Sequence, residues 1–200
     1  MDNIEFRFAC AEDANDIYDV YAPYVKETSF TFEHEIPNIK TLQDRISDTI
    51  KIYPYIVCFV NGHIAGYTYA SRHMVRAGYQ WNAELSVYVK KEFCRLGIGT
   101  ALYTAIIEIL KLQNIHNVYV CVAKNNIASI KLHSKMGFDI VGTFHNAGYK
   151  LGEWHDILWM EKCIGNCNIP PEDFKGINEI EVNSIEDILE RSIHLCKNKK

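Results

Sequence analysis

Two apolar runs joined by a two-residue turn constrain the fold of this chain more than any other local feature. Residues 55–60 and 63–71 are rich in aromatic and β-branched side chains, and Asn61-Gly62 lies between them. Asn and Gly adopt the positive φ angles of a tight hairpin turn at little cost. We therefore predict an antiparallel hairpin here, and with it a sheet in the middle of the chain.

Apolar spacing on both sides of this hairpin predicts further strands and helices. Their alternation along the chain indicates one domain built around a mixed sheet, of the α/β (α+β) class. The expected elements, besides the hairpin, are strands at 4–10, 84–89, 118–122, 140–145 and 154–162, with helices at 12–24, 42–50, 97–110 and 126–136.

The end of the chain differs in character from the rest. We expect a domain over residues 1–165 and an appendage over 166–200, because Pro170-Pro171 interrupts the chain and acidic residues follow. Apolar residues spaced along 185–193 predict a short amphipathic helix in the appendage. Three arrangements are open for this segment: it packs on the domain, it contacts a partner, or it frays.

Composition excludes several classes of protein. The 200 residues are 48% hydrophobic and 23% charged with a net charge of −4, which does not suit broad nucleic-acid binding. No apolar run reaches the roughly 18 residues of a membrane helix. The start of the chain, Met1-Asp2-Asn3-Ile4-Glu5, has no basic or apolar leader, so a cytoplasmic location is expected.

Seven cysteines are present, an odd number, and most lie in apolar, strand-like surroundings. Buried free thiols in a reducing compartment are the expected state. Cys163 and Cys167 are four residues apart, but no second pair at zinc-ligand spacing accompanies them. We therefore predict no metal site.

A glycine-rich turn between a strand and a helix is the clearest candidate for a binding site. In the run 94–100, Gly97 and Gly99 open the helix, where exposed N–H groups and the helix dipole favour an anion. A Rossmann fingerprint would need glycine in place of Leu102, and a Walker A loop would need Gly-Lys-Ser/Thr. The turn alone leaves two interpretations, a phosphate cradle and an ordinary tight turn.

The residues around this turn decide between them, because they resemble the GNAT superfamily of N-acetyltransferases. That family places Arg/Gln-x-x-Gly-x-Gly/Ala after a central strand; here Cys94 stands in the first position, and Arg95 beside it supplies a charge. The resemblance covers most of 3–162 and is closest to the phosphinothricin and methionine sulfoximine (sulfone) N-acetyltransferase branch. The residues that carry it are Glu27-Thr28, Phe32, Arg76, Tyr79, Trp81, Glu84, Ser86–Val89, Arg95–Thr100, Leu102–Thr104, Asn126, Ser129, Leu132-His133, Ala147–Lys150 and Trp154–Asp156.

The resemblance implies a GNAT fold, with a mixed, mostly antiparallel sheet of six to seven strands flanked by about four helices. It implies acetyl-CoA as cosubstrate, with its pyrophosphate on the glycine turn and its pantetheine arm along the strand before that turn. The implied cofactor-binding residues are Val87, Tyr88, Val89, Arg95, Leu96, Gly97, Ile98, Gly99, Thr100, Asn126 and Ser129.

Three catalytic candidates follow from the same resemblance. Glu84 is the implied general base, which removes a proton from the acceptor amine before direct attack on the thioester. His133 is the implied general acid for the leaving thiolate, and Tyr103 is a second candidate. From the residues alone, Glu84 is equally an ordinary strand-end carboxylate, Asn126 a helix N-cap, and His133 a packed helix histidine.

The implied acceptor is the α-amine of a small amino acid or analogue, of the phosphinothricin or methionine sulfoximine type. Its pocket is expected to be lined by Phe32, Arg76, Tyr79, Trp81 and Tyr149, with Arg76 binding the carboxylate. Alternatives are a different small amine, a protein N-terminus, or a non-catalytic CoA-binding module. A small-molecule substrate and a homodimer are expected, without a nucleic-acid or membrane partner.

Overall fold

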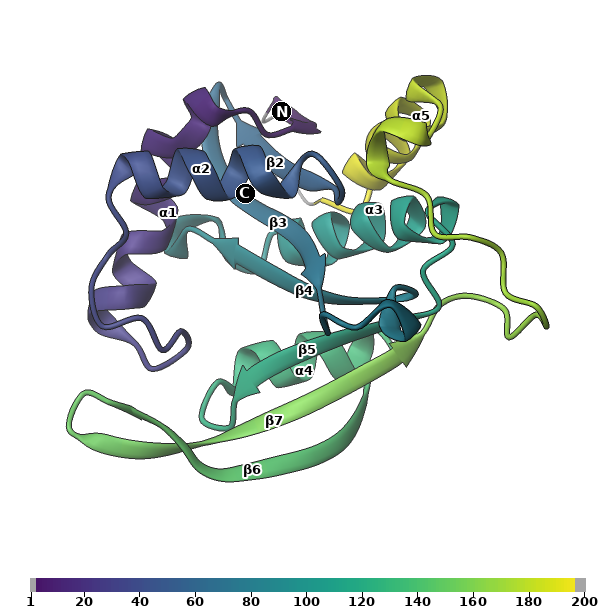
Figure 1. The fold of residues 1–200 in the computed structure, drawn as a ribbon. Coiled ribbons are helices and arrows are strands. Elements are labelled where there is room, and N and C mark those ends of the chain that lie inside the picture. Colours follow the sequence, from purple (N-terminus) through teal and green to yellow (C-terminus); the bar gives the residue numbers. More distant parts are fainter. Residues whose placement is uncertain (1–2, 197–200) are drawn as a thin grey trace.

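The computed structural model describes residues 3–196 and contains one seven-stranded sheet (Figure 1). The strand order is β1-β2-β3-β4-β5-β7-β6, and every neighbouring pair is antiparallel except β4 and β5. This confirms the predicted mixed, mostly antiparallel sheet. The strands are β1 (Ile4–Phe8), β2 (Tyr55–Val60), β3 (His63–Arg72), β4 (Asn82–Val89), β5 (Asn117–Ala123), β6 (Asp139–Lys150) and β7 (Glu153–Cys163).

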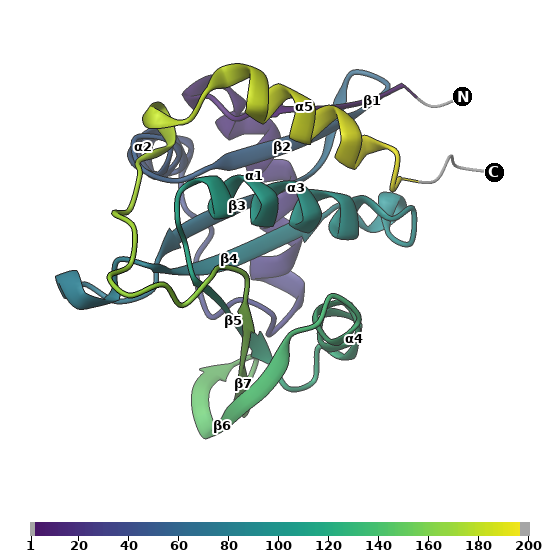
Figure 2. The ribbon, with the colours of Figure 1, turned by 90° about the vertical axis from the view of Figure 1, so that its right-hand side faces the viewer.

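Helices cover both faces of the sheet and bury one apolar cluster on each (Figure 2). Strand β2 shows the two sides: Ile56 and Cys58 belong to the cluster under α3, whereas Tyr55 and Val57 belong to the cluster under α1 and α2. This alternation follows from the two-residue period of a strand. The helices among the described residues are α1 (Ala14–Glu27), α2 (Ile39–Thr49), α3 (Ile98–Leu112), α4 (Ile127–Lys135) and α5 (Val182–Ile193).

The predicted hairpin is confirmed. Asn61 and Gly62 both have positive φ, 53° and 83°, and the strands close with Val60 opposite His63. A register shift between Cys58 and Phe59 adds a bulge that sequence spacing did not indicate.

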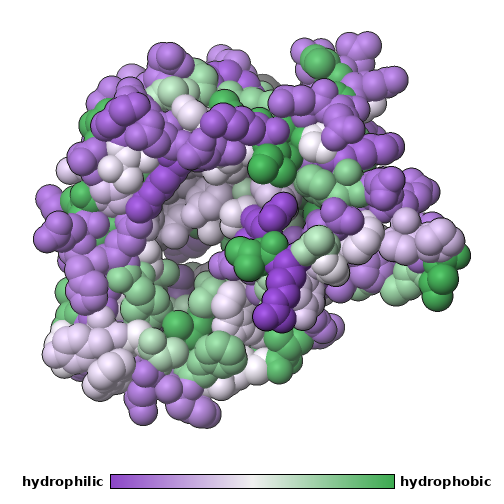
Figure 3. All heavy atoms as spheres, viewed as in Figure 1, coloured by the Kyte–Doolittle hydropathy of each residue, from purple (hydrophilic) through white to green (hydrophobic). Residues whose placement is uncertain are grey.

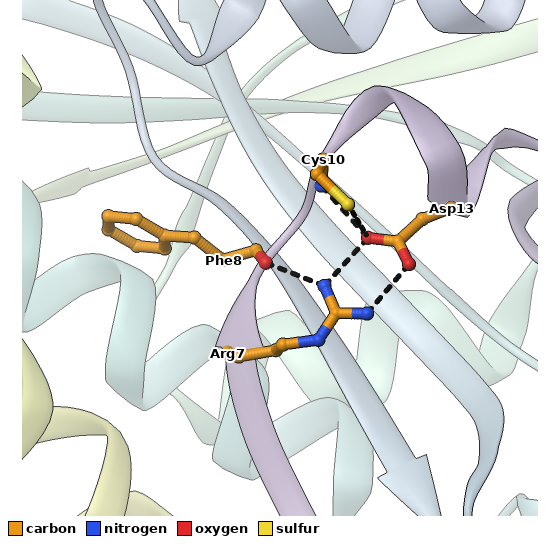
Figure 4. Close-up of polar contacts among 4 residues, drawn as sticks. All are labelled: Arg7, Phe8, Cys10 and Asp13. Carbon is orange, nitrogen blue, oxygen red and sulfur yellow. Dashed lines mark hydrogen bonds and ion pairs between the residues drawn. The ribbon is translucent and has the colours of Figure 1, made fainter.

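A buried carboxylate joins the first strand to the first helix (Figure 4). Asp13 receives two hydrogen bonds of 2.7 Å from the Arg7 guanidinium and one of 2.8 Å from the Cys10 backbone N–H. The Arg7 and Cys10 bonds hold the pKa of Asp13 below its usual range, although burial of the carboxylate opposes them. The bidentate pair therefore fixes the direction in which α1 leaves β1.

The sheet parts between β4 and β5. Their parallel pairing covers only Asn82–Glu84 against Asn117–Tyr119, and beyond Glu84 the two strands diverge. Figure 1 shows the resulting V, with β1–β4 in one arm and β5, β7 and β6 in the other. The backbone of β4 after Glu84 therefore faces a gap in the ladder on one side, rather than another strand.

The C-terminal segment packs on the domain. Helix α5 lies against α3, and its residues Ile185, Ile188 and Leu189 are buried in the same cluster as the core of α3. At its end, the chain crosses the glycine turn: a Cβ at Gly97 would lie 2.6 Å from the carbonyl oxygen of Leu195. Of the three arrangements left open for this segment, packing on the domain is the one observed over residues 166–196.

The expectation that most cysteines are buried is wrong. All seven are free, as expected, but only Cys58 is buried, and Cys94, Cys121, Cys163 and Cys167 are exposed. Cys121 shows why: it lies in an apolar strand, yet at the parted edge of the sheet, where one side of the strand is open.

Candidate active site

The gap between β4 and β5 holds a small cavity lined by both strands, by α3 and by the start of α4. Figure 3 shows the molecule hollowed between its two arms in this region. The cleft forms because the two parallel strands stop pairing, which leaves main-chain groups along its wall. The lining residues are Tyr24, Phe30, Leu85, Ser86, Val87, Tyr88, Tyr103, Val120, Cys121, Val122, Asn126, Ser129 and His133.

Glu84 stands where the two strands part, directly before the first lining residue of β4. Burial raises the pKa of its carboxyl, and the nearby His73 opposes that rise. The His73 Nδ1 atom lies 3.7 Å from Glu84 Oε2, and the Glu84 side chain is 32% exposed. A half-buried carboxylate with a raised pKa at the mouth of a cleft is suited to accepting a proton near neutral pH.

His73 is a site residue to which the sequence analysis gave no role. Its ring stacks on Tyr119 with centroids 4.2 Å apart and meets the edge of Trp159 at 5.3 Å. The contact joins the end of β3 to β5 and β7, which are far apart in the sequence. No local pattern signals such a contact, because a single histidine at a strand end has many possible neighbours.

Tyr103 and His133 form a buried hydrogen-bonded pair beside the cleft. His133 Nδ1 lies 2.8 Å from the Ser129 carbonyl oxygen, so we assign the ring proton to Nδ1. Nε2 then accepts a hydrogen bond from the Tyr103 hydroxyl at 3.0 Å. Burial lowers the pKa of His133 to about 4 and raises that of Tyr103. At neutral pH His133 is therefore uncharged, and it presents an acceptor to Tyr103.

The predicted phosphate cradle is a strand–turn–helix connection. Helix α3 begins at Ile98, directly after Gly97, whose φ of 84° favours glycine. No side chain caps this helix, and helix geometry leaves its first N–H groups without an intrahelical acceptor. Arg95 also has a positive φ, 68°, so the turn curls back before the helix begins. The turn therefore presents N–H donors, as an anion site requires.

The edge of β4 that leads to this turn is partly occupied. The Tyr24 hydroxyl donates a 2.7 Å hydrogen bond to the Val89 carbonyl oxygen, and the Val89 N–H points to the same hydroxyl at 3.4 Å. Val87 and Tyr88 line the cavity directly. Main-chain pairing with an extended ligand is thus available along 85–88 where a backbone group faces away from β3, since the Ser86 carbonyl oxygen already accepts a hydrogen bond from Thr68 Oγ1. At Val89 the Tyr24 hydroxyl occupies the backbone groups and ends this edge.

Asn126 and Ser129 meet at the start of α4. The Asn126 side chain accepts a hydrogen bond of 3.2 Å from the Ser129 N–H, which is the arrangement of a helix N-cap. Both residues also line the cavity. The structural role expected from the sequence is therefore confirmed, and the predicted cofactor contact is compatible with it.

The loop that carries Phe32 closes onto the arm of β6 and β7. A Cβ at Gly148 would lie 2.2 Å from the Phe32 ring, so this ring packs directly on the glycine backbone. Beside it, the buried ammonium of Lys150 donates a hydrogen bond of 2.6 Å to the Thr31 carbonyl oxygen. Glycine and lysine thus hold the loop across the mouth of the V.

The other predicted acceptor residues are spread over two places. Arg76 and Tyr79 are exposed on the turn between β3 and β4, and Tyr149 packs against Trp154 on β6 and β7. The Trp81 indole N–H donates a 2.7 Å hydrogen bond to the Glu172 carbonyl oxygen, against the C-terminal segment. None of these residues lines the cavity between β4 and β5, and their assignment to the acceptor pocket stays a prediction.

Over residues 3–196, no three His, Cys, Asp or Glu side chains are arranged to hold a metal ion. Within that part of the chain, no helix has the length and apolar character to cross a bilayer.

Comparison with known proteins identifies the family. The family model described as acetyltransferase (GNAT) domain matches residues 6–159. The chain belongs to the GNAT acetyltransferases. It is an acetyltransferase that uses acetyl-CoA as cosubstrate, as the sequence resemblance implied.

Curated relatives and solved structures point to one branch of this family. Phosphinothricin N-acetyltransferase of Streptomyces viridochromogenes is 31% identical over 184 residues, covering 88% of this chain and 96% of that protein. The L-methionine sulfoximine/L-methionine sulfone acetyltransferase of Pseudomonas paraeruginosa is 33% identical over 110 residues, covering 54% and 64%. A phosphinothricin acetyltransferase from Sinorhizobium meliloti, solved with acetyl-CoA, matches with a TM-score of 0.76 and 29% identity, over 81% of this chain and 89% of that one.

Proposed function

We propose that this acetyltransferase transfers the acetyl group of acetyl-CoA to the α-amine of a small amino acid or analogue, of the phosphinothricin or methionine sulfoximine type. The observation that carries the proposal is Glu84, a half-buried carboxylate with a raised pKa at the point where β4 and β5 part. The names of the relatives support the substrate class.

Glu84 acts as the general base in this proposal. An amino-acid ammonium must lose a proton before its nitrogen can attack a thioester, and the Glu84 carboxylate accepts that proton. The carboxyl is tuned for this task by two opposed effects, burial and the adjacent His73. Acetyl-CoA supplies the activated acyl group, and the chain supplies position and proton transfer.

The Tyr103–His133 pair stabilises the leaving group, which is the thiolate of CoA. Because His133 is uncharged and accepts from Tyr103, the mobile proton of the pair is the Tyr103 hydroxyl proton. Because a hydroxyl has one proton, Tyr103 gives up its bond to His133 Nε2 when it donates to the departing sulfur, and this new hydrogen bond stabilises the negative charge there without complete proton transfer. We therefore assign the donor role to Tyr103, with His133 as its hydrogen-bond partner.

The cofactor lies along the parted edge of β4 with its pyrophosphate at the turn of α3. The backbone of Val87 and Tyr88 pairs with the pantetheine arm, and the N–H groups of 97–100 bind the pyrophosphate with Arg95 beside them. Leu96, Asn126 and Ser129 complete the contact. The N–H donors at the start of α3 and the cavity lining support this path.

The acceptor enters from the side of Glu84. Arg76 binds its carboxylate, and Phe32, Tyr79, Trp81 and Tyr149 enclose its side chain. The exposed position of Arg76, on the turn between β3 and β4, supports a role in capturing an anion from solvent.

We further propose a cytoplasmic homodimer. The seven free cysteines suit a reducing compartment. Apolar side chains exposed on the arm of β6 and β7 suit a contact between two copies of the chain; they are Ile140, Val141, Phe144, Tyr149, Leu151 and Trp154. Light scattering coupled to size exclusion measures the assembly directly, and a monomer at micromolar concentration would contradict the dimer.

The test of the main proposal is release of free CoA from acetyl-CoA, measured with a panel of acceptors. The panel contains amino acids, phosphinothricin, methionine sulfoximine, methionine sulfone, a polyamine and a peptide with a free N-terminus. Turnover with the amino-acid group and none with the same compounds N-blocked is the expected result. Preference for the polyamine or the peptide would move the substrate class to one of the alternatives.

A calorimetric titration with acetyl-CoA separates the remaining alternative. Tight binding of acetyl-CoA without turnover of any amine would indicate a non-catalytic binding module. The matched Glu84→Gln variant serves as the inactive control in both measurements, because it preserves the size of the side chain.

A further inference from the structure

A second cavity lies outside the cleft of the acetyl-transfer site. Its volume is about 530 Å³, and it is enclosed by the start of β4, the end of α3 and the segment after β7. The Trp81 indole forms one wall, and Cys167 and His116 lie together on another. Trp81, proposed above for the acceptor pocket, also lines this cavity, whereas none of the residues assigned to the base, the leaving group or the cofactor does.

Two cysteines share one histidine at this cavity. Cys167 Sγ lies 3.0 Å from His116 Nε2, and Cys163 Sγ lies 3.9 Å from the same nitrogen. The two sulfurs therefore flank one ring nitrogen. The Cys163 thiol also lies 3.5 Å from the Gly165 carbonyl oxygen, an acceptor for its proton. Cys167 is thus the thiol that shares its proton with the imidazole.

The backbone holds this arrangement in place. The N–H groups of Ile164 and Gly165 both donate to the His116 carbonyl oxygen, at 2.8 and 3.1 Å. A Cβ at Gly165 would lie 2.8 Å from the Ile115 carbonyl oxygen, so the close approach requires glycine. The chain then turns, and Cys167 contacts the ring of His116. The backbone of His116 is thus bonded to the start of the loop, and its side chain is bonded to Cys167.

Two further observations indicate reactivity rather than packing. Both cysteines are exposed, so a reagent in solvent can reach them. His116 Nδ1 is buried and has no hydrogen-bond partner among the described residues. The side-chain hydrogen-bond partners of this imidazole among the described residues are the two thiols.

We propose that Cys167, Cys163 and His116 form a thiol–disulfide exchange site, at which low-molecular-weight disulfides modify the enzyme. The Cys167 proton passes to His116 Nε2, and the thiolate attacks one sulfur of the disulfide. A mixed disulfide forms on Cys167, and the other half leaves as a thiolate. His116 passes its proton to this first leaving thiolate and then takes the proton of Cys163. The Cys163 thiolate attacks the Cys167 sulfur, which releases the second half as a thiolate that His116 protonates, and a Cys163–Cys167 disulfide remains. The external disulfide is reduced and the two cysteines are oxidised.

The first experiment measures alkylation of the reduced full chain with limiting iodoacetamide, read by peptide mass mapping. Cys94, exposed but without a histidine partner, is the internal reference. Cys167 is expected to react about tenfold faster than Cys94 near neutral pH. The His116→Phe variant is expected to lose that advantage. Equal rates for the two cysteines, or an unchanged rate in His116→Phe, would overturn the proposal.

The second experiment uses oxidised glutathione as the probe. The full chain is expected to lose two hydrogen atoms in mass, with Cys163 and Cys167 joined in one peptide pair. The Cys163→Ser variant is expected to stop at a stable glutathione adduct on Cys167. An adduct on Cys167 that persists while Cys163 is intact would refute the role of Cys163. No reaction at either cysteine would refute the site, whatever the outcome for acetyl transfer.

Discussion

The Tyr103 hydroxyl donates a hydrogen bond of 3.0 Å to Nε2 of His133, and both side chains are almost completely buried. The other nitrogen of this ring lies 2.8 Å from the Ser129 carbonyl oxygen. The two bonds together fix the tautomer, and burial lowers the pKa of the ring so that it stays neutral. His133 is therefore held as an acceptor, and it would have to gain a proton before it could act as an acid.

His133 makes folding stability depend on pH. Its pKa is about 4 in the folded chain and about 6.5 in an unfolded one, so only the unfolded state takes up the proton between these values. The free energy of unfolding is therefore highest above pH 6.5, and protonation of the unfolded state lowers it by up to about 3 kcal/mol as pH falls to 4. Urea unfolding from pH 7 to pH 4 measures it, and His133→Gln should flatten the slope. An equal slope in both proteins would contradict the assignment.

Tyr103→Phe removes the proposed donor and keeps the ring. We expect kcat to fall by roughly 10- to 100-fold, while the Kd for acetyl-CoA stays nearly constant. The change also leaves His133 Nε2 without its partner, which costs about 1–3 kcal/mol of folding stability. Turnover is therefore measured well below the melting temperature of the variant. A normal kcat in folded Tyr103→Phe would exclude Tyr103 from the reaction.

Glu84→Gln removes the proposed base. We expect kcat to fall about 10²- to 10⁴-fold with acetyl-CoA binding retained. Because the carboxylate must be ionised to act, kcat/KM of the natural chain should decline as pH falls below its raised pKa. That acidic limb should be absent from the residual activity of the variant. Near-normal turnover by Glu84→Gln would show that another group takes the proton.

His73→Phe tests the tuning of Glu84. The phenyl ring can keep the stacking on Tyr119, but the imidazole that lowers the pKa of Glu84 is removed. The acidic limb of kcat/KM should therefore move to higher pH. A purely structural role for His73 would lower activity at every pH without moving the limb, so the pH profile separates the two.

Gly148→Ala tests the loop that crosses the mouth of the V. A methyl group at this position overlaps the Phe32 ring, so the loop has to shift. We expect KM for the amine to rise at least several-fold, because Phe32 is proposed to line its pocket. Gly142→Ala is the matched control, since it lies on the same strand and nothing is within 4 Å of its Cβ position. Equal KM values for the two variants would argue against Phe32.

Prediction from the sequence succeeded where the signal is local. The Asn61-Gly62 hairpin, the glycine turn before α3 and the Asn126 cap each depend on a few adjacent residues. The turn between β6 and β7 was missed. Leu151 and Gly152 have φ of 53° and 84°, the same kind of turn as Asn61-Gly62. Leucine rarely adopts that conformation, so β6 was expected to end near residue 145, whereas it extends to Lys150.

Long-range contacts account for the other differences. The approach of His73 to Glu84 depends on how β3, β5 and β7 meet, which no spacing along the chain encodes. The amphipathic helix near residue 185 was visible, but its partner was not, because the outer face of α3 resembles any other apolar helix face. The pairing of Cys167 with His116 likewise joins residues 51 positions apart.

The contact between Gly97 and Leu195 has a practical side. A bulky label attached to a side chain at Leu195 would lie beside the turn proposed to hold the pyrophosphate. Asn3 lies instead beside Asn61, with which its backbone forms two hydrogen bonds. A spectroscopic label is therefore better placed at Asn3 than at Leu195.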